Sequence, residues 1–584
     1  MKKEVMKKGQ LLRRTIPYIK KEKGLFFLTI FLCLATSVLS ATTPFITKSI
    51  LDTFLPNEDY KAVILLLGIY ATVVILLVLA RYFFQYINTL TGMHIEKNLR
   101  EDAMEKINYL PVDYYSLEPD GKIVAKITSD SGGVRAFYTT MFSIVNAVFN
   151  ILIVYIGIII MEPMLGLLIL IIVPILLLWI TLYRKWVHRY FVDLRETSSR
   201  ITGKLNENIT GAMIIQDFNQ EAKIIDEYET LVKRYVRNER VTQSINNTMG
   251  FELLSMIKRF AEISLLLYLG FSQVNALGMV ISIGLIGAIV ENLDKMINPF
   301  NVIFNNLNEL EDSMVGATRC YGFIDEVNDT RIFDGCDAPE NITGEINFKN
   351  ISFAYIGENY VLKDLSLDVK AGQTVGIVGH TGSGKSSLMN LLLTYNDYQK
   401  GEILIDNVPI TNYKKSSIRK HMGIVLQTPT LFEGTIKSNI TMERDYPDEV
   451  VIKALIDVGG QHLLEKNELG INTPISFRGE NLSLGEKQLI SFARVLLRNP
   501  KILVLDEATA NIDSETENSI KNAMNVVSKG RTTLIIAHRL STIKDADKIV
   551  VLDHGKIIGE GDHKSLYNEC NVYKDMYDSQ FKNK

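Results

Sequence analysis

TVGIVGHTGSGKSSL, residues 374–388, decides the fold of the C-terminal part of this chain. An apolar run, a glycine-rich turn and a helix start follow one another, and the turn fits the spacing GxxxxGK[ST] from Gly379 to Ser386. Glycines let backbone N–H groups close around phosphates, a lysine adds a point charge and a serine hydroxyl ligates Mg²⁺. The stretch therefore predicts a strand, a phosphate-binding loop and a helix within an α/β domain.

This loop supplies the residues that we expect to hold ATP, with Lys385 on the β- and γ-phosphates and Ser386 on Mg²⁺. His380 occupies a place in the loop for which we expect no catalytic role. The predicted ATP contacts here are Gly379, His380, Thr381, Gly382, Ser383, Gly384, Lys385, Ser386 and Ser387.

KILVLDEATANID predicts a buried strand that ends in Asp506 and Glu507, where open α/β sheets bind their ligands. We expect Asp506 to hold Mg²⁺ through water and Glu507 to be the general base for the attacking water. The alternative is a pair of acids that merely caps a strand end.

Two other apolar runs also end in polar side chains. In TLIIAHRLSTI the apolar run is followed by His538, a neutral donor suited to sensing a γ-phosphate. In MGIVLQTPTLFEGTI the amide of Gln427 is placed to reach Mg²⁺ or water, and a surface turn is the alternative. We therefore count His538 and Gln427 with Glu507 as catalytic candidates, and Gln427 with Ser386 and Asp506 as magnesium candidates.

The first 300 residues are different in character, because they hold long apolar runs instead of alternating patterns. Each run is close to the ~20 residues that a bilayer requires. The first 23 residues are rich in lysine and arginine, which places the N-terminus in the cytoplasm by the positive-inside rule. The six predicted spans lie near residues 24–47, 61–83, 139–161, 164–183, 253–273 and 276–297.

A polar segment with Gly and Pro, residues 328–344, separates the apolar part from the first strand-like stretch, EINFKNISFAY. We expect an all-α, six-helix transmembrane domain over residues 1–335. An α/β P-loop ATPase domain is expected over residues 345–584. The fold class is thus a multidomain membrane protein.

Charge and cysteine content exclude other classes. The net charge of −3 provides no field for nucleic acid, so no nucleic-acid partner is expected. The four cysteines lie far apart without a CxxC pair, which gives no disulfide framework and no zinc site.

In chain order, FAY, GHTGSGKS, VLQ, LSLGEKQ, LVLDEATANID and IIAHRLSTI resemble the motif set of an ATP-binding cassette. With six spans ahead of it, the whole chain resembles a half-transporter of the ATP-binding-cassette (ABC) exporter family. The resemblance implies that two cassettes pair head to tail, so that LSLGE of one closes over the ATP of the other. Ser483 and the Gly485 N–H would then clasp the γ-phosphate, in a turn formed by Ser483, Leu484, Gly485 and Glu486 ahead of a helix from about residue 486.

The same resemblance implies further roles. Tyr355 would stack on adenine, with an ordinary strand aromatic as the alternative, and Asp513 would lie in the dimer-interface loop. Residues 110–123 and 207–223 would be coupling regions that dock on the cassettes, unless they are plain helical turns. The signature departs from the commonest LSGGQ, because Leu484 replaces a glycine and Glu486 a glutamine, which puts nucleotide affinity in question.

The expected function is ATP-driven export of a small or amphipathic molecule, such as a drug, lipid or peptide, by alternating access. An importer on the same fold and an ATP-gated channel or receptor are the alternatives. Partners would be membrane lipid, the substrate and a second half-transporter, with a homodimer preferred over a heterodimer. Charges inside spans mark pathways and nominate Arg81, Glu262 and Glu291, with solvated or locally paired charges as the favoured alternative.

Overall fold

The computed structural model describes residues 6–163, 166–167, 172–245, 247–248, 252–274, 282–466, 468–506, 514–537 and 540–581. The chain divides into two compact units. The helical unit comprises Met1–Ile107 and Asp120–Glu326, and the sheet unit comprises Asn108–Pro119 and Val327–Lys584. A helical part followed by a part with β-sheets is the predicted order, which the structure confirms.

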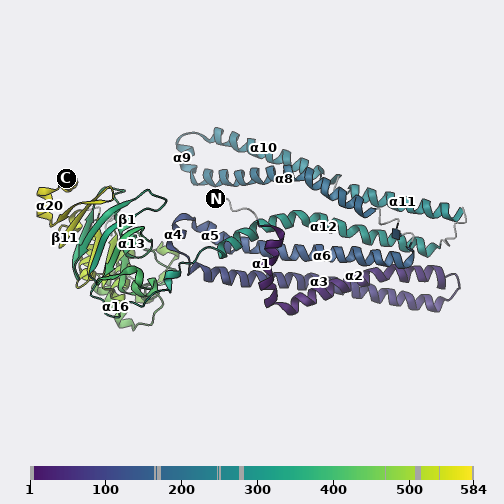
Figure 1. Ribbon diagram of the computed structural model, residues 1–584, viewed down its shortest axis with the longest axis horizontal. Coiled ribbons are helices and arrows are strands. Elements are labelled where there is room, and N and C mark those ends of the chain that lie inside the picture. The colour runs from purple at the N-terminus through teal and green to yellow at the C-terminus, as the bar shows by residue number, and fades with distance from the viewer. Residues whose placement is uncertain are drawn as a thin grey trace. The chain divides into compact units, whose positions relative to one another are not determined.

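Long helices make up the first unit. Figure 1 shows α2, α3, α6 and α12 running side by side, and α8 and α10 joined by the short α9 as an antiparallel pair. The helices are α1 (Lys8–Lys21), α2 (Lys23–Ser49), α3 (Tyr60–Ile107), α5 (Asp120–Ile127), α6 (Ser129–Met161), α8 (Ile172–Thr210), α9 (Ala212–Asp217), α10 (Glu221–Ile245), α11 (Leu253–Val274) and α12 (Ile283–Ile324).

Three helical segments among the described residues are long and apolar enough to cross a bilayer, namely Lys23–Phe54, Tyr60–Ile107 and Asp120–Met161. They contain the first three predicted spans. The remaining three stay predictions, because 164–183 and 276–297 are described only in part and α11 carries three charged residues.

Helices α6 and α12 pack closely around Gly133. A Cβ atom built on Gly133 would lie 3.0 Å from both the Ala317 nitrogen and the Ser313 carbonyl oxygen, which are backbone atoms. One turn earlier, the buried Asp130 accepts hydrogen bonds from Arg319 of α12 at 2.6 and 2.8 Å. A small residue and an ion pair therefore fix this crossing together.

The sheet unit has two main sheets. The strands β2 (Leu362–Val369), β1 (Ile346–Phe353), β4 (Lys400–Ile405) and β5 (Val408–Pro409) form an antiparallel sheet in that order. The second sheet has the order β12-β11-β3-β10-β9-β6, in which only β12 is antiparallel to its neighbour. Its strands are β12 (Lys556–Gly561), β11 (Lys548–Asp553), β3 (Thr374–Val378), β10 (Thr532–Ile536), β9 (Ile502–Asp506) and β6 (Met422–Val425).

The parallel strands are buried on both faces. In β9, Ile502 and Val504 pack with the antiparallel sheet and α13 (Lys385–Leu392). Leu503 and Leu505 point the other way, into a core with α16 (Asp448–Asp457), α18 (Leu484–Arg498) and α19 (Ser514–Ser528). Because both faces are covered, the strand carries an unbroken apolar run, as the sequence predicted. The other helices of this unit are α4 (Val112–Leu117), α14 (Lys415–Ile418), α15 (Ile436–Thr441), α17 (Gln461–Glu465), α20 (His563–Glu569) and α21 (Asn571–Phe581).

Residues Asn108–Pro119 belong to the sheet unit although they precede it by two hundred residues. The Asn396 amide donates a hydrogen bond to the Asp113 carboxylate of α4, and the Asp329 N–H donates to the Tyr109 carbonyl at 2.8 Å. Asp329 also accepts from the buried Lys415 ammonium at 2.8 Å. The segment with α4 thus packs on the start of the sheet unit.

The carboxylate of Asp406 fastens the chain that enters β1. It accepts hydrogen bonds from the N–H groups of Thr343, Gly344 and Glu345 at 2.7–3.0 Å and from the Thr343 hydroxyl. Burial opposes its ionisation, but these donors outweigh burial and hold the pKa of Asp406 below its ordinary value. Asp406 and Asn407, with φ of 51° and 66°, form the two-residue turn between β4 and β5.

Alanine substitutions at Gly132 and Gly133 are expected to have opposite effects on stability. Both glycines lie in α6, where alanine favours the helix by about 1 kcal/mol. A Cβ on Gly132 would meet only Glu96 Oε1 at 3.8 Å, so Gly132→Ala should raise the unfolding temperature of the detergent-purified protein. Gly133→Ala should lower it, since forcing two helix backbones apart costs about 1–3 kcal/mol. Equal shifts would contradict the close packing described above.

Asp406→Asn keeps a residue that suits the turn and removes the charge, so it isolates the carboxylate. We expect a loss of about 1–3 kcal/mol of stability at pH 7. A lowered pKa means that the stabilisation is complete above the unfolded-state pKa, about 3.9, and disappears as the pH falls through the lower folded-state value. Denaturation from pH 7 to pH 3 should therefore show the gap to wild type closing below about pH 4. The exposed Asp445→Asn is the control, and a pH-independent gap would refute the assignment.

Candidate nucleotide-binding site

The carboxyl ends of four parallel strands meet at one edge of the six-stranded sheet. Ile536 of β10 pairs with Ile377 of β3 on one side and Asp506 of β9 on the other, and Val425 of β6 pairs with Leu505. The loops that follow these strands therefore leave the sheet side by side. This register brings the phosphate loop, Asp506 and the segment of Gln427 to the same edge, which is where such sheets bind ligands.

Three predicted residues, Glu507, His538 and Asp513, lie outside the described residues. The residues directly before the first two are described: Asp506 ends β9, and the buried Ala537 follows β10. The roles of Glu507, His538 and Asp513 stay predictions.

Backbone geometry makes two loop glycines necessary. Gly384 has φ of 105° directly before α13, and a Cβ atom there would lie 2.6 Å from Leu362 Cδ2. A Cβ on Gly379 would overlap the Leu552 carbonyl oxygen. Only glycine allows the turn to close this tightly between β3 and α13.

The side chain of Lys385, the first residue of α13, contacts the preceding phosphate loop. Its buried ammonium donates to the carbonyl oxygens of Gly379 at 2.7 Å and His380 at 3.0 Å. Within the described part of the chain, the buried Ser383 hydroxyl has no hydrogen-bond partner. A cation and an unsatisfied hydroxyl inside a glycine turn are groups that a polyphosphate satisfies. The residues present therefore fit a nucleotide.

The residues predicted for Mg²⁺ offer a hydroxyl from Ser386, a carboxylate from Asp506 and an amide from Gln427. All three provide oxygen donors, which Mg²⁺ prefers, and few protein ligands are needed when phosphates complete the shell. Ser386 is exposed at the start of α13, and Asp506 is half-buried. The donor set is consistent with the ion, and the magnesium role stays a prediction.

Tyr355 lies beside the loop. Its hydroxyl is 3.1 Å from Ser387 Oγ at the start of α13, and its ring meets Phe353 edge-on with centroids 4.7 Å apart. About half of Tyr355 remains exposed (53%), which is compatible with the predicted contact with a base. Ser387 is buried, and its described partner is this tyrosine.

The signature turn opens α18 two residues earlier than predicted, at Leu484. The physical reason is a capping box: Ser483 Oγ accepts from the Glu486 N–H at 3.2 Å, and Glu486 Oε2 accepts from the Ser483 N–H at 2.7 Å. Glu486 Oε1 also accepts from the Lys466 ammonium at 2.8 Å. Burial opposes ionisation, yet the bonds from Lys466 and Ser483 prevail and keep the pKa of Glu486 below its ordinary value.

Sequence reasoning missed two residues at this turn. The fully buried Gln488 donates from its amide to the carbonyl oxygens of Leu426 at 3.2 Å and Gln427 at 2.9 Å, and so ties α18 to the Gln427 loop. A glutamine on the buried face of an amphipathic helix is the signal that was available. Lys466 has no local signal, because its partner lies 20 residues away.

Two of the three charged residues nominated within the predicted membrane spans are paired. Glu262 lies 3.6 Å from Lys258 and 3.4 Å from Arg259, and Glu291 lies 2.6 Å from Lys295. Arg81 is exposed. The favoured alternative, local pairing, therefore describes the two glutamates.

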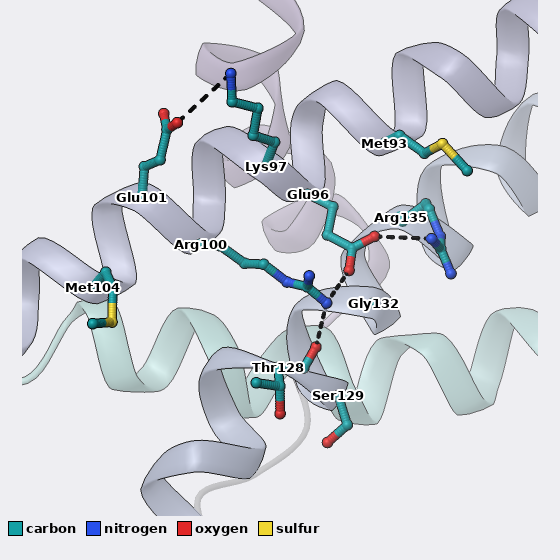
Figure 2. A pocket seen from close by; sticks show the side chains of 10 residues that line it. All are labelled: Met93, Glu96, Lys97, Arg100, Glu101, Met104, Thr128, Ser129, Gly132 and Arg135. Atoms are coloured by element: carbon teal, nitrogen blue, oxygen red, sulfur yellow. Dashed lines mark hydrogen bonds and ion pairs between the residues drawn. The ribbon is translucent and has the colours of Figure 1, made fainter. Parts of the chain in front are cut away.

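A separate hollow of about 690 Å³ lies in the helical unit, lined by α3, by Thr128 and by the start of α6. Figure 2 shows its ion-pair network, in which the buried Glu96 carboxylate lies between Arg100, at 2.5 Å, and Arg135, at 3.1 Å. Arg100 also donates to the Thr128 carbonyl oxygen and the Ser131 hydroxyl. None of the predicted site residues lines this hollow, and we regard the network as a tie between α3 and the start of α6.

Comparison with known proteins gives the family. Residues 26–299 match the family described as "ABC transporter transmembrane region", and residues 362–510 match "ABC transporter". The chain is 39% identical to the "probable multidrug resistance ABC transporter ATP-binding/permease protein YheH" of Bacillus subtilis, over 90% of this chain and 78% of that protein. It is 34% identical to the "putative ABC transporter ATP-binding protein exp8" of Streptococcus pneumoniae, over 98% and 97%.

A third relative is the "multidrug resistance-like ATP-binding protein MdlB" of Buchnera aphidicola, 29% identical over 98% of each chain. The helical unit and the phosphate-loop sheet described above thus correspond to the two matched regions. This chain belongs to the ABC transporter family, as an exporter-like half-transporter with its membrane region and its transport-coupled ATPase domain in one polypeptide.

Proposed function

We propose that this half-transporter pairs with a second one and uses ATP to export a small or amphipathic molecule, such as a drug, lipid or peptide, across the cytoplasmic membrane. The observation that carries the proposal is the phosphate loop on a parallel sheet whose strand ends bring Asp506 and the Gln427 segment beside it. The apolar helices of the same chain and the multidrug-resistance names of two relatives support a membrane pump.

In this proposal the loop from Gly379 to Ser387 holds the nucleotide, and Lys385 exchanges its two carbonyl partners for phosphate oxygens. Bound Mg²⁺ would neutralise phosphate charge. Asp506, Ser386 and Gln427 orient the oxygens and water around it, and Glu507 removes a proton from the attacking water. His538 donates toward the γ-phosphate, and Tyr355 packs on the base.

The signature turn serves the partner's nucleotide. Ser483 and Gly485 lie at the first turn of α18, a helix of 15 residues whose N-terminus carries partial positive charge. Two half-transporters arranged head to tail would give each ATP one phosphate loop and one signature turn, with Asp513 at the interface. We favour self-pairing, and a heterodimer with another half-transporter is the competing arrangement.

The proposed topology places the N-terminus and the ATPase domain in the cytoplasm. The basic stretch that includes α1 favours this orientation, because positively charged segments stay on the cytoplasmic side. The proposed domains are residues 1–335 in and around the membrane and 345–584 for ATP.

We assign the coupling between ATP hydrolysis and transport to α4 and α9. Helix α9 exposes the large apolar side chains of Met213 (80%) and Ile214 (64%), followed by Phe218 (71%). Apolar side chains gathered at a helical turn are typical of a docking surface. We assign α9 to contact a cassette in the dimer, and α4 to transmit movement through Asp113 and Asn396.

An importer on the same fold and an ATP-gated channel or receptor are the competing functions. Net accumulation of a substrate against its gradient distinguishes a pump from a channel, and the direction of that accumulation distinguishes an exporter from an importer.

Glu507→Gln should abolish ATP hydrolysis by the purified chain in lipid nanodiscs. Loss of the general base is expected to lower the Mg²⁺-dependent rate by about 10²–10⁴-fold while ATP still binds. Lys385→Ala, which removes the phosphate contact, is the companion variant and should weaken ATP binding as well. An active wild-type chain expressed alone supports self-pairing. A folded but inactive one overturns self-pairing and directs attention to a partner half-transporter.

A charge on α9 should uncouple hydrolysis from transport. Met213→Asp places a carboxylate on the proposed docking surface, so ATP-driven uptake of a cationic dye such as ethidium into inverted vesicles should fall while ATP hydrolysis persists. Ile225→Asp, at an exposed apolar residue on α10 outside that turn, is the matched control. Equal loss in both variants, or none in either, would remove α9 from the proposal.

A further inference from the structure

We infer that Lys466 is a positioning residue of the signature turn: its ammonium neutralises Glu486, so that the γ-phosphate of the partner's ATP can approach Ser483 and Gly485. The inference rests on the proposed role of this turn. It explains how a chain with glutamate in place of the usual glutamine can still receive a triphosphate.

The geometry places a full negative charge at the turn. Glu486 is buried, at 9% exposure, and both of its carboxylate oxygens accept hydrogen bonds. One bond comes from the N–H of Ser483, the residue expected to touch phosphate. The lowered pKa of Glu486 means that the carboxylate is ionised at neutral pH.

This charge has two opposite effects. An acid in the first turn stabilises α18, because it complements the positive end of the helix. The same acid repels an incoming phosphate, since like charges a few ångströms apart interact strongly near a protein surface. A glutamine would have capped the turn without this repulsion.

Lys466 removes the conflict. It follows α17 and reaches Glu486 Oε1 at 2.8 Å, while the lysine side chain is 62% exposed and the glutamate side chain 10% exposed. The lysine therefore compensates a buried charge from the solvent side. An ordinary surface ion pair that holds α17 on α18 is the competing explanation, and it predicts an effect on stability without an effect on ATP.

A double-mutant cycle separates these explanations. Lys466→Met should raise the KM for ATP by about three- to tenfold, the size expected of one partly screened charge, with a smaller change in kcat. Lys466→Arg should restore the wild-type value. In a Glu486→Gln background, Lys466→Met should add nothing, because no charge remains to be neutralised.

Lys548→Met is the control, since Lys548 pairs with Glu560 at 2.7 Å on β11 and β12, at the opposite end of the sheet from β6. An unchanged KM in Lys466→Met, or a rise that persists with Glu486→Gln, overturns the inference. Absence of Lys385-dependent hydrolysis in the wild-type chain is a different result, which counts against the self-pairing that is part of the proposed function.

A second measurement needs neither ATP nor a partner. Ser483→Cys places a thiol at the turn, and the rate of its alkylation by iodoacetamide reports how well the site stabilises a thiolate. A Cys336→Ser background removes the exposed native thiol, and the other three cysteines are buried. Adding Lys466→Met should slow alkylation about threefold or more at pH 7.5, as the thiol pKa rises by about half a unit. Equal alkylation rates with and without Lys466→Met would show that Lys466 does not set the electrostatic potential at the signature turn.

Discussion

Burial of the parallel sheet on both faces is the constraint on which the site depends. The strands β3, β6, β9 and β10 have apolar neighbours on each side, so polar side chains are accommodated where the strands end. Parallel register brings those ends to one edge, and residues from four distant segments meet there. The chemistry proposed for this chain thus follows from the way in which the sheet is covered.

Local sequence patterns explain why the strands of the parallel sheet and the phosphate loop could be predicted. The run TVGIV, the glycine turn and the start of α13 are adjacent in sequence, and each has a distinct conformational requirement. The strands of Asp506 and Gln427 were recognisable for the same reason, because fully buried strands are continuous apolar runs. The family resemblance then added the head-to-tail pairing, which no single chain displays.

Contacts between distant segments were beyond the reach of these patterns. Lys466 is an unremarkable lysine in sequence, and only the fold places it against Glu486. Helix α18 begins at Leu484, two residues before the predicted start, because a reciprocal cap between Ser483 and Glu486 extends the helix. Gln488 is a polar residue on a buried helical face, which is a visible sequence signal. Only the structure shows that its partners are the carbonyl oxygens of Leu426 and Gln427.

Because Asn108–Pro119 belongs to the sheet unit, the residues of that unit do not form one continuous stretch of the chain. An ATPase domain excised at residue 345 would leave behind Asp113 and Asp329, the partners of Asn396 and of the buried Lys415. Lys415 would keep Asp397, at 3.5 Å, as its described acidic neighbour. Chimeras that exchange cassettes between relatives would therefore have to exchange this short segment as well, because the cassette's surface is completed by residues encoded within the membrane half of the gene.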